Sequence, residues 1–437
     1  MIRLRGSAWM AATSAAQVSS AIVGLATNIV YARFLELADI GTIALANSVS
    51  IMVAIFADRG LGLEITRQMS REQLPARHAF RIYQVSGSIV LLPVIAGLCL
   101  ADSIVVRDSL RDVNVFVFSA LLAAGLFQYQ SGLALVQGSN LPYHRAAGIS
   151  GNATLTLGLT VGALYLGLGV AGAILSSALA FALAGGWLSW CSTRRTQEIS
   201  SSTYSKPMRL QALRRGRRMY GTNLIVYLVA TGDVLLASVI TSPATVGQYQ
   251  IVRKIAQGVT MPMIVLLPML LGKLSGPGVR DKVHRSVQLC AYLSVLVSAV
   301  VLASVVALDW PIELVFGTDY AGLGIACGVL LGGLFLQFVK DLLATIANAA
   351  DADNLPLLAN LTVLVGVIGA FPLLPPMTLS GFVFVPVTYF AAGATLMAFL
   401  LAWRRVLPAA AIIRVGGCVA IVALAIVATS LAGWIAQ

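Results

Sequence analysis

Apolar stretches long enough to cross a bilayer follow one another along almost the whole chain. A membrane-spanning helix needs about 20 mainly apolar residues. Thirteen such stretches are predicted, at residues 8–32, 40–65, 80–101, 113–136, 147–168, 170–191, 219–241, 246–271, 286–308, 322–349, 355–374, 379–402 and 411–434. Because backbone polar groups inside lipid must be hydrogen-bonded within the protein, such stretches fold as α-helices. The chain is therefore predicted to be an all-α polytopic membrane protein.

The composition leaves no room for a large aqueous domain. Only 11% of the 437 residues are charged, 58% are hydrophobic, and the mean hydropathy is +0.89. A soluble domain carries about 25% charged residues. The activity is therefore expected to lie in or beside the bilayer.

Lys and Arg are distributed unevenly between the predicted loops. With the N-terminus placed in the cytoplasm, alternation of the spans leaves only Arg33, Arg107 and Arg111 in outside loops. An excess of Lys and Arg marks cytoplasmic loops. The asymmetry explains the net charge of +12 without nucleic acid as a partner, and it predicts a C-terminus outside the cell.

A basic hydrophilic stretch divides the predicted spans into two sets. Residues 194–218 carry eight Lys and Arg and are predicted to be a cytoplasmic linker. It joins an N-terminal six-helix bundle at 1–193 to a C-terminal six-helix bundle at 219–405, and residues 406–437 add one extra C-terminal span. The basic run at 214–218 is either a topology anchor or a site that captures an acidic substrate.

Short sequence matches relate the two bundles. Ala-Asp-Ile-Gly-Thr at 38–42 is echoed by Ala-Thr-Val-Gly-Gln at 244–248, and Asn-Leu-Pro occurs at 140–142 and again at 354–356. The matches keep their order at nearly the same offset. Since six spans per bundle give both bundles the same orientation, we expect a parallel pseudo-repeat around a central cavity.

Ionisable side chains lie inside several of the apolar stretches. They are Asp58, Arg59, Asp233, Arg253, Lys254, Lys340 and Asp341. A charge at the bilayer centre costs at least about 2.5–3.5 kcal/mol, so such residues face the bundle interior and mark a pathway or binding site. Four are cations and three are anions. This mixture predicts a cavity that holds a negatively charged group while it crosses.

Two neighbouring cations are the strongest candidates for binding that group. Arg253 and Lys254 are adjacent in the eighth predicted span, and Asp233 in the seventh is the expected counter-ion of one of them. The other cation would then be available to a ligand anion. Arg binds phosphate through a bidentate fork, and Lys binds it as a point charge.

The remaining charged pairs have two interpretations each. Asp58 and Arg59 either line the cavity or tie the second span to its neighbours through an internal ion pair. Lys340, beside Asp341, either faces the cavity or snorkels to the cytoplasmic surface.

Uncharged polar side chains on apolar spans are candidates for binding sugar. The candidates are Asn28 in the first span and Gln128, Gln130 and Gln137 in or just after the fourth, of which Gln130 and Gln137 are seven residues apart and share a helix face. Asn47, Asn152, Asn223 and Asn360 serve equally well as hydrogen-bonding contacts between helices.

The sequence contains no pattern typical of catalysis. The five cysteines are scattered without a C-x-x-C spacing and are interpreted as small buried hydrophobes. Asp351 and Asp353 form a single D-x-D, which is weak evidence for a glycosyltransferase without an aqueous domain. The chain is predicted not to be an enzyme and to use no metal and no cofactor.

A series of short motifs resembles a known family of transporters. The motifs are Tyr31-Ala-Arg-Phe-Leu, Asp39-Ile-Gly, Asp58-Arg-Gly-Leu-Gly, Thr66-Arg, Val136-Gln-Gly-Ser-Asn, Gly232-Asp, Val246-Gly-Gln-Tyr, Arg253-Lys-Ile-Ala and Phe316-Gly-Thr-Asp-Tyr. In this order they resemble Wzx-type polysaccharide flippases, which belong to the MOP exporter superfamily with the MATE exporters and the lipid II flippase. The resemblance covers residues 7–402, and Asp233 matches an acid common in the family's seventh span.

Two features depart from the family pattern. The predicted number of spans is odd, whereas family members usually have an even number. The loop Asn348-Ala-Ala-Asp-Ala-Asp-Asn is acidic, where relatives usually carry a glycine turn with basic residues.

The resemblance implies a flippase for polyprenyl-pyrophosphate-linked oligosaccharide repeat units of the O-antigen, exopolysaccharide or capsule type. It would move them from the cytoplasmic to the outer leaflet of the bacterial inner membrane by alternating access. The expected partners are this substrate, membrane lipids, a coupling ion (proton or sodium) and polysaccharide polymerase and assembly proteins.

Two other functions stay open. A MATE-like multidrug or cation antiporter would favour a cavity dominated by acids, whereas cations outnumber acids in these spans. A membrane glycosyltransferase or polysaccharide polymerase would carry a large outer catalytic loop, whereas the predicted outer loops are short.

Overall fold

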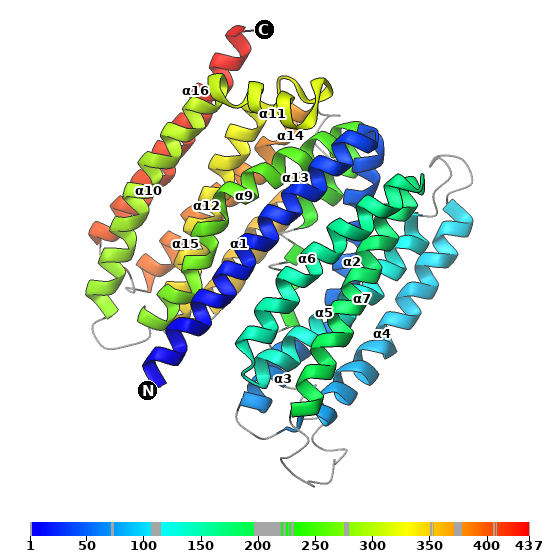
Figure 1. Ribbon diagram of the computed structural model, residues 1–437. Helices are drawn as coiled ribbons and strands as arrows, with labels where there is room; N and C mark the ends of the chain where they lie inside the picture. The colour runs from blue at the N-terminus through cyan, green and yellow to red at the C-terminus, as the bar shows by residue number, and fades with distance from the viewer. Residues whose placement is uncertain are drawn as a thin grey trace. The chain divides into compact units, whose positions relative to one another are not determined.

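The protein is described by a computed structural model. It describes residues 2–70, 74–105, 115–195, 220–221, 224–225, 227–228, 231–274, 279–349, 352, 354–370, 378–404, 407 and 409–436. Their regular structure is helical throughout (Figure 1). The predicted linker lies outside these residues from 196 to 218, and so do residues 350, 351 and 353 of the acidic loop at 348–354.

Contacts divide the chain into two compact units. Unit 1 comprises Met1–Leu35 and Thr42–Leu235, and unit 2 comprises Glu36–Gly41 and Leu236–Gln437. The helices of unit 1 are α1 (Ile2–Phe34), α2 (Leu37–Asp58), α3 (Leu61–Ser70), α4 (Ala76–Val105), α5 (Val115–Gly138), α6 (Pro142–Tyr165) and α7 (Gly169–Arg195). The first residues of α2 belong to unit 2, and a described helix at Thr231–Ile240 spans the boundary at Leu235.

Unit 2 is built around α12. Its helices are α9 (Pro243–Leu274), α10 (Val279–Ala307), α11 (Asp309–Phe316), η1 (Thr318–Tyr320), α12 (Gly324–Ala349), α13 (Asn354–Ala370), α14 (Leu379–Phe382), α15 (Phe384–Trp403) and α16 (Ala409–Ala436). Helix α12 packs against α9, α10, α15 and α16. It is the most buried of the spans, since 72% of its apolar window lies inside the protein.

The predicted helices are present, with one correction. A described helix overlaps each of the thirteen predicted stretches. Eight described helices are long and apolar enough to span a membrane, or nine if the bent pair Cys290–Ser304 and Asp309–Phe316 is one span. The prediction of one unbroken helix over 40–65 is wrong, because α2 ends at Asp58 and α3 begins at Leu61.

Hydroxyl groups join the helices of unit 1. Ser50 of α2 donates to the carbonyl oxygen of Ser119 in α5 at 2.8 Å. The hydroxyls of Ser139, after α5, and Ser192 of α7 are 2.6 Å apart. Small polar residues let helices approach closely in lipid and hydrogen-bond across the interface. These contacts fix α2, α5 and α7 as one packed group.

The last helix is an integral part of unit 2. Helices α16 and α10 run side by side (Figure 1), and the buried Thr429 donates to the carbonyl oxygen of Val301 at 3.3 Å. Val422 and Cys418 of α16 are also buried. The extra C-terminal span is therefore packed into the bundle.

Candidate functional site

Asp58 organises the turn between α2 and α3. Arg59 and Gly60 have positive φ angles of 49° and 73°, which end α2. The Asp58 carboxylate accepts the backbone N–H groups of Gly60 and Gly62, both at 3.0 Å, and the hydroxyl of Tyr83. The first N–H groups of a helix have no partner within it, so this carboxylate satisfies the start of α3.

The Asp58 turn explains the resemblance motif at this position. Asp58 supplies the acceptor, Gly60 supplies the left-handed turn, and Gly62 supplies an N–H close to the carboxylate. These contacts give Asp58 a structural role, although its partners among the described residues are backbone N–H groups and the Tyr83 hydroxyl rather than the ion-pair partner on a neighbouring helix that the sequence suggested. A cavity role for Asp58 or the half-buried Arg59 stays a prediction.

A buried acid in α3 was missed from the sequence. Glu64 is 2% exposed, and its carboxylate accepts a 2.7 Å hydrogen bond from Nε2 of Gln68. Interpreting 40–65 as one span put Glu64 at a solvated helix end. The spacing of four residues between Glu64 and Gln68 was the available signal, because such pairs share a helix face.

The predicted sugar-binding side chains do not form one cluster. Asn28 donates to the carbonyl oxygen of Gly24 in its own helix at 2.7 Å. Gln130 and Gln137 are half-buried on α5. Gln128, also on α5, makes a contact across helices, since its Oε1 accepts a 2.6 Å hydrogen bond from Nε2 of Gln84 in α4.

The adjacent cations of α9 are not isolated charges. Arg253 and Lys254 are half-buried, and each takes part in polar or electrostatic contacts, so the expectation that one would be left without a partner is wrong. Asp233 accepts the backbone N–H of Val234 at 2.9 Å. Its pairing with Arg253 or Lys254, across the two units, stays a prediction.

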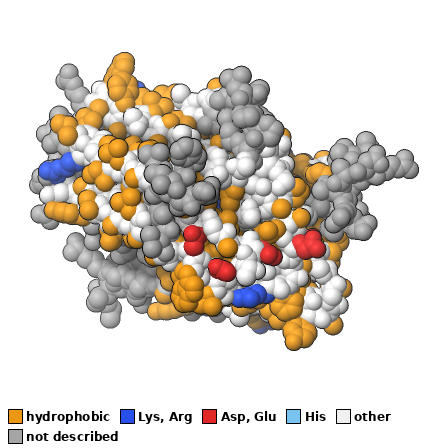
Figure 2. All heavy atoms as spheres, turned by 90° about the horizontal axis from the view of Figure 1, so that it is seen from above, with side chains coloured by type: hydrophobic (Ala, Val, Ile, Leu, Met, Phe, Trp, Pro, Cys, Tyr) orange, Lys and Arg blue, Asp and Glu red, His pale blue; other side chains and the backbone are white. Residues whose placement is uncertain are grey.

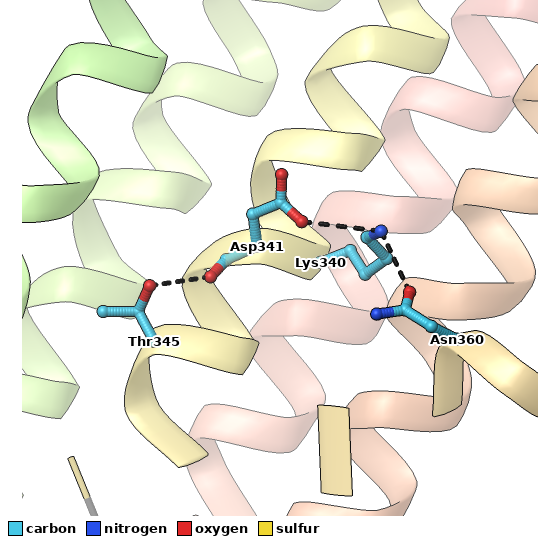
Figure 3. A network of polar contacts seen from close by, with 4 residues as sticks. All are labelled: Lys340, Asp341, Thr345 and Asn360. Carbon is cyan, nitrogen blue, oxygen red and sulfur yellow. Dashed lines mark hydrogen bonds and ion pairs between the residues drawn. The ribbon is translucent and has the colours of Figure 1, made fainter. Parts of the chain in front are cut away.

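Lys340 is the centre of a buried polar cluster in unit 2 (Figure 3). Its side chain is 5% exposed, and Nζ donates to Oδ1 of Asn360 in α13 at 3.1 Å. Nζ also lies 3.5 Å from Oδ1 of Asp341. Lys340 therefore does not snorkel to the surface. Asn360 is its hydrogen-bonding partner, and the bond joins α12 to α13, as the interpretation of Asn360 as a helix contact predicted.

Two aromatic rings of α15 complete the surroundings of Lys340. Nζ lies 5.8 Å from the ring centroids of both Tyr389 and Phe390. Cations within about 6 Å of a ring centroid are attracted by its electron-rich face. The Tyr389 hydroxyl is buried and has no hydrogen-bonding partner among the described residues. The cluster thus contains a buried ammonium group, on Lys340, and a buried hydroxyl, on Tyr389, that accepts and donates no hydrogen bond among the described residues.

A cavity of about 1000 Å³ lies in the same unit, at the starts of α9, α12 and α15. Hydroxyl groups line it, from Thr241, Ser242, Thr245, Thr378, Ser380 and Ser430. Gln248 adds an amide and Phe384 an aromatic ring, and no charged side chain of the described part of the chain lines it. Apolar side chains such as Ile325, Val329 and Leu379 complete the lining. A neutral lining of this mixed kind suits an uncharged ligand with polar and apolar faces, such as a sugar.

An acidic side chain lies at this end of unit 2. Asp309 caps the start of α12, since its carboxylate accepts the backbone N–H of Gly324 at 2.6 Å. Figure 2, viewed from above Figure 1, shows acidic and basic side chains among hydrophobic ones on the described surface. Within the described residues, no group of three His, Cys, Asp or Glu side chains could hold a metal ion.

The fold is that of known membrane transporters. A multidrug resistance MATE family transporter of the MOP superfamily, in an inward-facing conformation, matches with a TM-score of 0.65 at 14% identity, over 93% of this chain and 99% of that one. The MATE transporter VcmN of Vibrio cholerae matches with a TM-score of 0.60 at 13% identity, over 92% and 99%. A MOP superfamily transporter from Pyrococcus furiosus is described as having a binding pocket of reverse polarity. It matches with a TM-score of 0.58 at 14% identity, over 91% of this chain and 95% of that one.

The apolar spans and the fold define a multi-pass membrane protein with the fold of these transporters. A comparison with curated protein sequences gave no match. The family described as "Polysaccharide biosynthesis protein" matches residues 8–271. The chain belongs to this family, as the sequence motifs indicated.

Proposed function

We propose that the protein moves a polyprenyl-pyrophosphate-linked oligosaccharide from the cytoplasmic to the outer leaflet of the bacterial inner membrane. The arrangement of unit 2 along α12 carries the proposal. Val329 lines the hydroxyl-rich cavity, and Lys340 follows eleven residues later on nearly the same helix face. At about 1.5 Å per residue, the two lie about 16 Å apart along the axis.

This spacing suits a headgroup with two chemistries. Sugar hydroxyls would exchange hydrogen bonds with the neutral cavity lining. The pyrophosphate would interact with the Lys340 ammonium, which Asn360 and the Tyr389 and Phe390 rings hold in place. Charged residues within membrane spans are rare and usually mark a substrate or ion pathway, which supports a functional role for Lys340.

Helices α12 and α15 pack closely at Gly333, which lies between Val329 and Lys340 in the sequence. A Cβ placed on Gly333 of α12 would lie 3.5 Å from Cβ of Val387 in α15. A headgroup that reached from the cavity to Lys340 would have to pass this close contact. Transport would require α15 to move away from α12 at Gly333, as in alternating access.

Asp341 offers a way to couple this movement to an ion. The Lys340–Asp341 pair, at 3.5 Å, is longer than the about 2.7–2.9 Å of a tight charged hydrogen bond. The Asp341 side chain is 39% exposed, against 6% for Lys340. A proton or sodium ion that reached Asp341 would weaken its hold on Lys340, which could then bind phosphate.

The MATE-like neighbours favour a second candidate, export of organic cations. Their identity of 13–14% supports the fold alone. The charge of the site argues against this candidate, because a cation ligand would meet the Lys340 ammonium, and the cavity lining offers no acid from the described residues.

Deletion followed by complementation tests the proposal. Without the protein, lipid-linked repeat units should accumulate in the inner leaflet and surface polysaccharide should be lost. Wild type and Lys340→Arg, which keeps the charge, should restore export, whereas Lys340→Met should not. Normal surface polysaccharide in the deletion strain, with no second flippase present, would contradict the proposal.

A further inference from the structure

A second cavity lies in unit 1, where α4 begins and α7 ends. Its volume is about 690 Å³, and residues from α4, α5 and α7 line it. The lining residues that matter here are Arg77, His78, Arg81, Gly186, Ser189 and Trp190. The basic residues of the chain predict that this end of unit 1 is cytoplasmic. The mouth of the cavity would therefore lie at the headgroups of the inner leaflet.

Two arginines give the cavity a positive charge. Arg77 and Arg81 are one helical turn apart on α4, both line the cavity, and both are exposed. Neither has an ion-pair or hydrogen-bonding partner within the described ranges. Two guanidinium groups at this spacing can bind one phosphate through parallel N–H donors.

An apolar stripe continues from these arginines along α4. Val85, Ile89 and Leu92 are 49%, 56% and 64% exposed, and they follow Arg81 at helical spacing. Residues three or four apart lie on one helix face. The face therefore changes from basic to apolar in the direction from the headgroups into the bilayer.

A second stripe with the same polarity runs along α7. Leu183, Trp187 and Trp190 are 51%, 40% and 50% exposed and lead to Arg194 in the last turn. The Arg194 guanidinium lies 4.4 Å from the centroid of the Trp190 ring. Tryptophan is enriched where the membrane meets water, which supports placing this end at the interface.

Two small residues shape the cavity wall on α7. The Ser189 hydroxyl is buried and has no hydrogen-bonding partner in the described part of the protein. Nothing lies within 4 Å of the position that a Cβ on Gly186 would take. The wall thus offers an unused hydroxyl and open space beside the two arginines.

We propose that this cavity binds an anionic phospholipid of the inner leaflet. The phosphate binds Arg77 and Arg81, and the two acyl chains lie along the stripes of α4 and α7. Two apolar stripes match the two chains of a phospholipid better than the single chain of a polyprenyl pyrophosphate. The proposal does not depend on the transported substrate.

Lipid titration of the purified full-length protein in detergent tests this site, read out by native mass spectrometry. Phosphatidylglycerol should bind more tightly than phosphatidylcholine and than inorganic phosphate. The double variant Arg77→Gln/Arg81→Gln should weaken phosphatidylglycerol binding about 30-fold, since each basic residue contributes about one kcal/mol to binding of anionic lipid. Gly186→Leu should weaken it by filling the cavity.

Matched controls separate this site from general charge effects. Arg404→Gln removes one exposed positive charge from unit 2 and should leave phosphatidylglycerol binding unchanged. All variants should keep the wild-type melting temperature in lipid-free detergent. Equal binding of both phospholipids, wild-type binding by the double variant, or tighter binding of undecaprenyl pyrophosphate to the same residues would each overturn the proposal.

Discussion

Gly41 of α2 and Gly247 of α9 pack against each other reciprocally within unit 2. A Cβ on Gly41 would overlap the carbonyl oxygen of Pro243 and lie 3.2 Å from the backbone nitrogen of Gly247. A Cβ on Gly247 would overlap the carbonyl oxygen of Leu37 and lie 3.2 Å from the backbone nitrogen of Gly41. These glycines occupy equivalent places in the repeated segments 38–42 and 244–248. The two repeated segments therefore meet where α2 and α9 cross closely.

This crossing should not tolerate a methyl group. Gly41→Ala and Gly247→Ala are each expected to destabilise the protein by about 1–3 kcal/mol, because the added Cβ meets backbone that cannot move aside. Thermal unfolding in detergent measures the effect. Gly258→Ala, in α9 with nothing within 4 Å of its Cβ position, is the matched control and should melt like wild type.

Variants of Lys340 and Asp341 should show that the effect of this charge pair on stability differs from its effect on transport. Lys340→Met leaves the Asp341 carboxylate without its cation and should cost about 1–3 kcal/mol, since Asp341 is partly exposed. Adding Asp341→Asn should recover most of this loss in a thermal unfolding assay while export stays absent. If the double variant exported substrate normally, neither charge would be needed for transport.

Joining α12 to α15 should stop transport. The Cβ separation of 3.5 Å between Gly333 and Val387 lies within the about 3.5–4.5 Å of disulfides. In a background lacking the five native cysteines, Gly333→Cys/Val387→Cys should export when reduced and stop when oxidised. Each single cysteine variant should be insensitive to oxidant. Full export by the oxidised double variant, with the cross-link verified by mass spectrometry, would exclude separation of the helices at this point.

Removal of the Asp58 carboxylate should destabilise the turn between α2 and α3. Asp58→Ala removes the partner of two backbone N–H groups and of the Tyr83 hydroxyl, and should destabilise the protein by about 1–2 kcal/mol. Asp58→Asn keeps one acceptor oxygen and should cost less. Equal melting temperatures for Asp58→Ala and wild type would show that α3 does not depend on this carboxylate.

Tyr320 should make the protein sensitive to alkaline pH. Burial, with a contribution from the charge of Asp319, raises the pKa of Tyr320 from 10.0 to about 12. The folded state therefore favours the neutral phenol, and this contribution to stability is complete below pH 10 and is lost as the pH rises from 10 to 12. Tyr320→Phe should reduce the fall in melting temperature over this range. An identical fall in both proteins would contradict the assignment.

The helices were predictable because periodicity and length depend on local sequence. The break at Asp58 was not, because the apolar pattern continues through Leu61 and Ile65 into α3. The hydrogen bonds from the backbone N–H groups of Gly60 and Gly62 show that the carboxylate caps a new helix, and these bonds depend on the folded turn.

The sequence identified Lys340 as a charge inside an apolar span, but it did not predict which side chains contact it. Lys340 was identified by its cost inside an apolar span, but Asn360 and Tyr389 come from other helices, and no spacing in the sequence connects them to Lys340. The basic cavity was missed for the same reason. Arg77 and Arg81 were interpreted as cytoplasmic loop charges, and only the packing of α4 against α7 places them beside Trp190.

Flipping in vesicles tests the central claim most directly. The purified protein is reconstituted into vesicles with a fluorescent polyprenyl-pyrophosphate-linked oligosaccharide. Movement of this substrate is measured as the fraction that an external glycosidase can reach. Wild type should move inner-leaflet substrate outward faster than empty vesicles and faster than Lys340→Met. Equal rates for wild type and empty vesicles, under a proton or sodium gradient and without one, would contradict the assignment as a flippase.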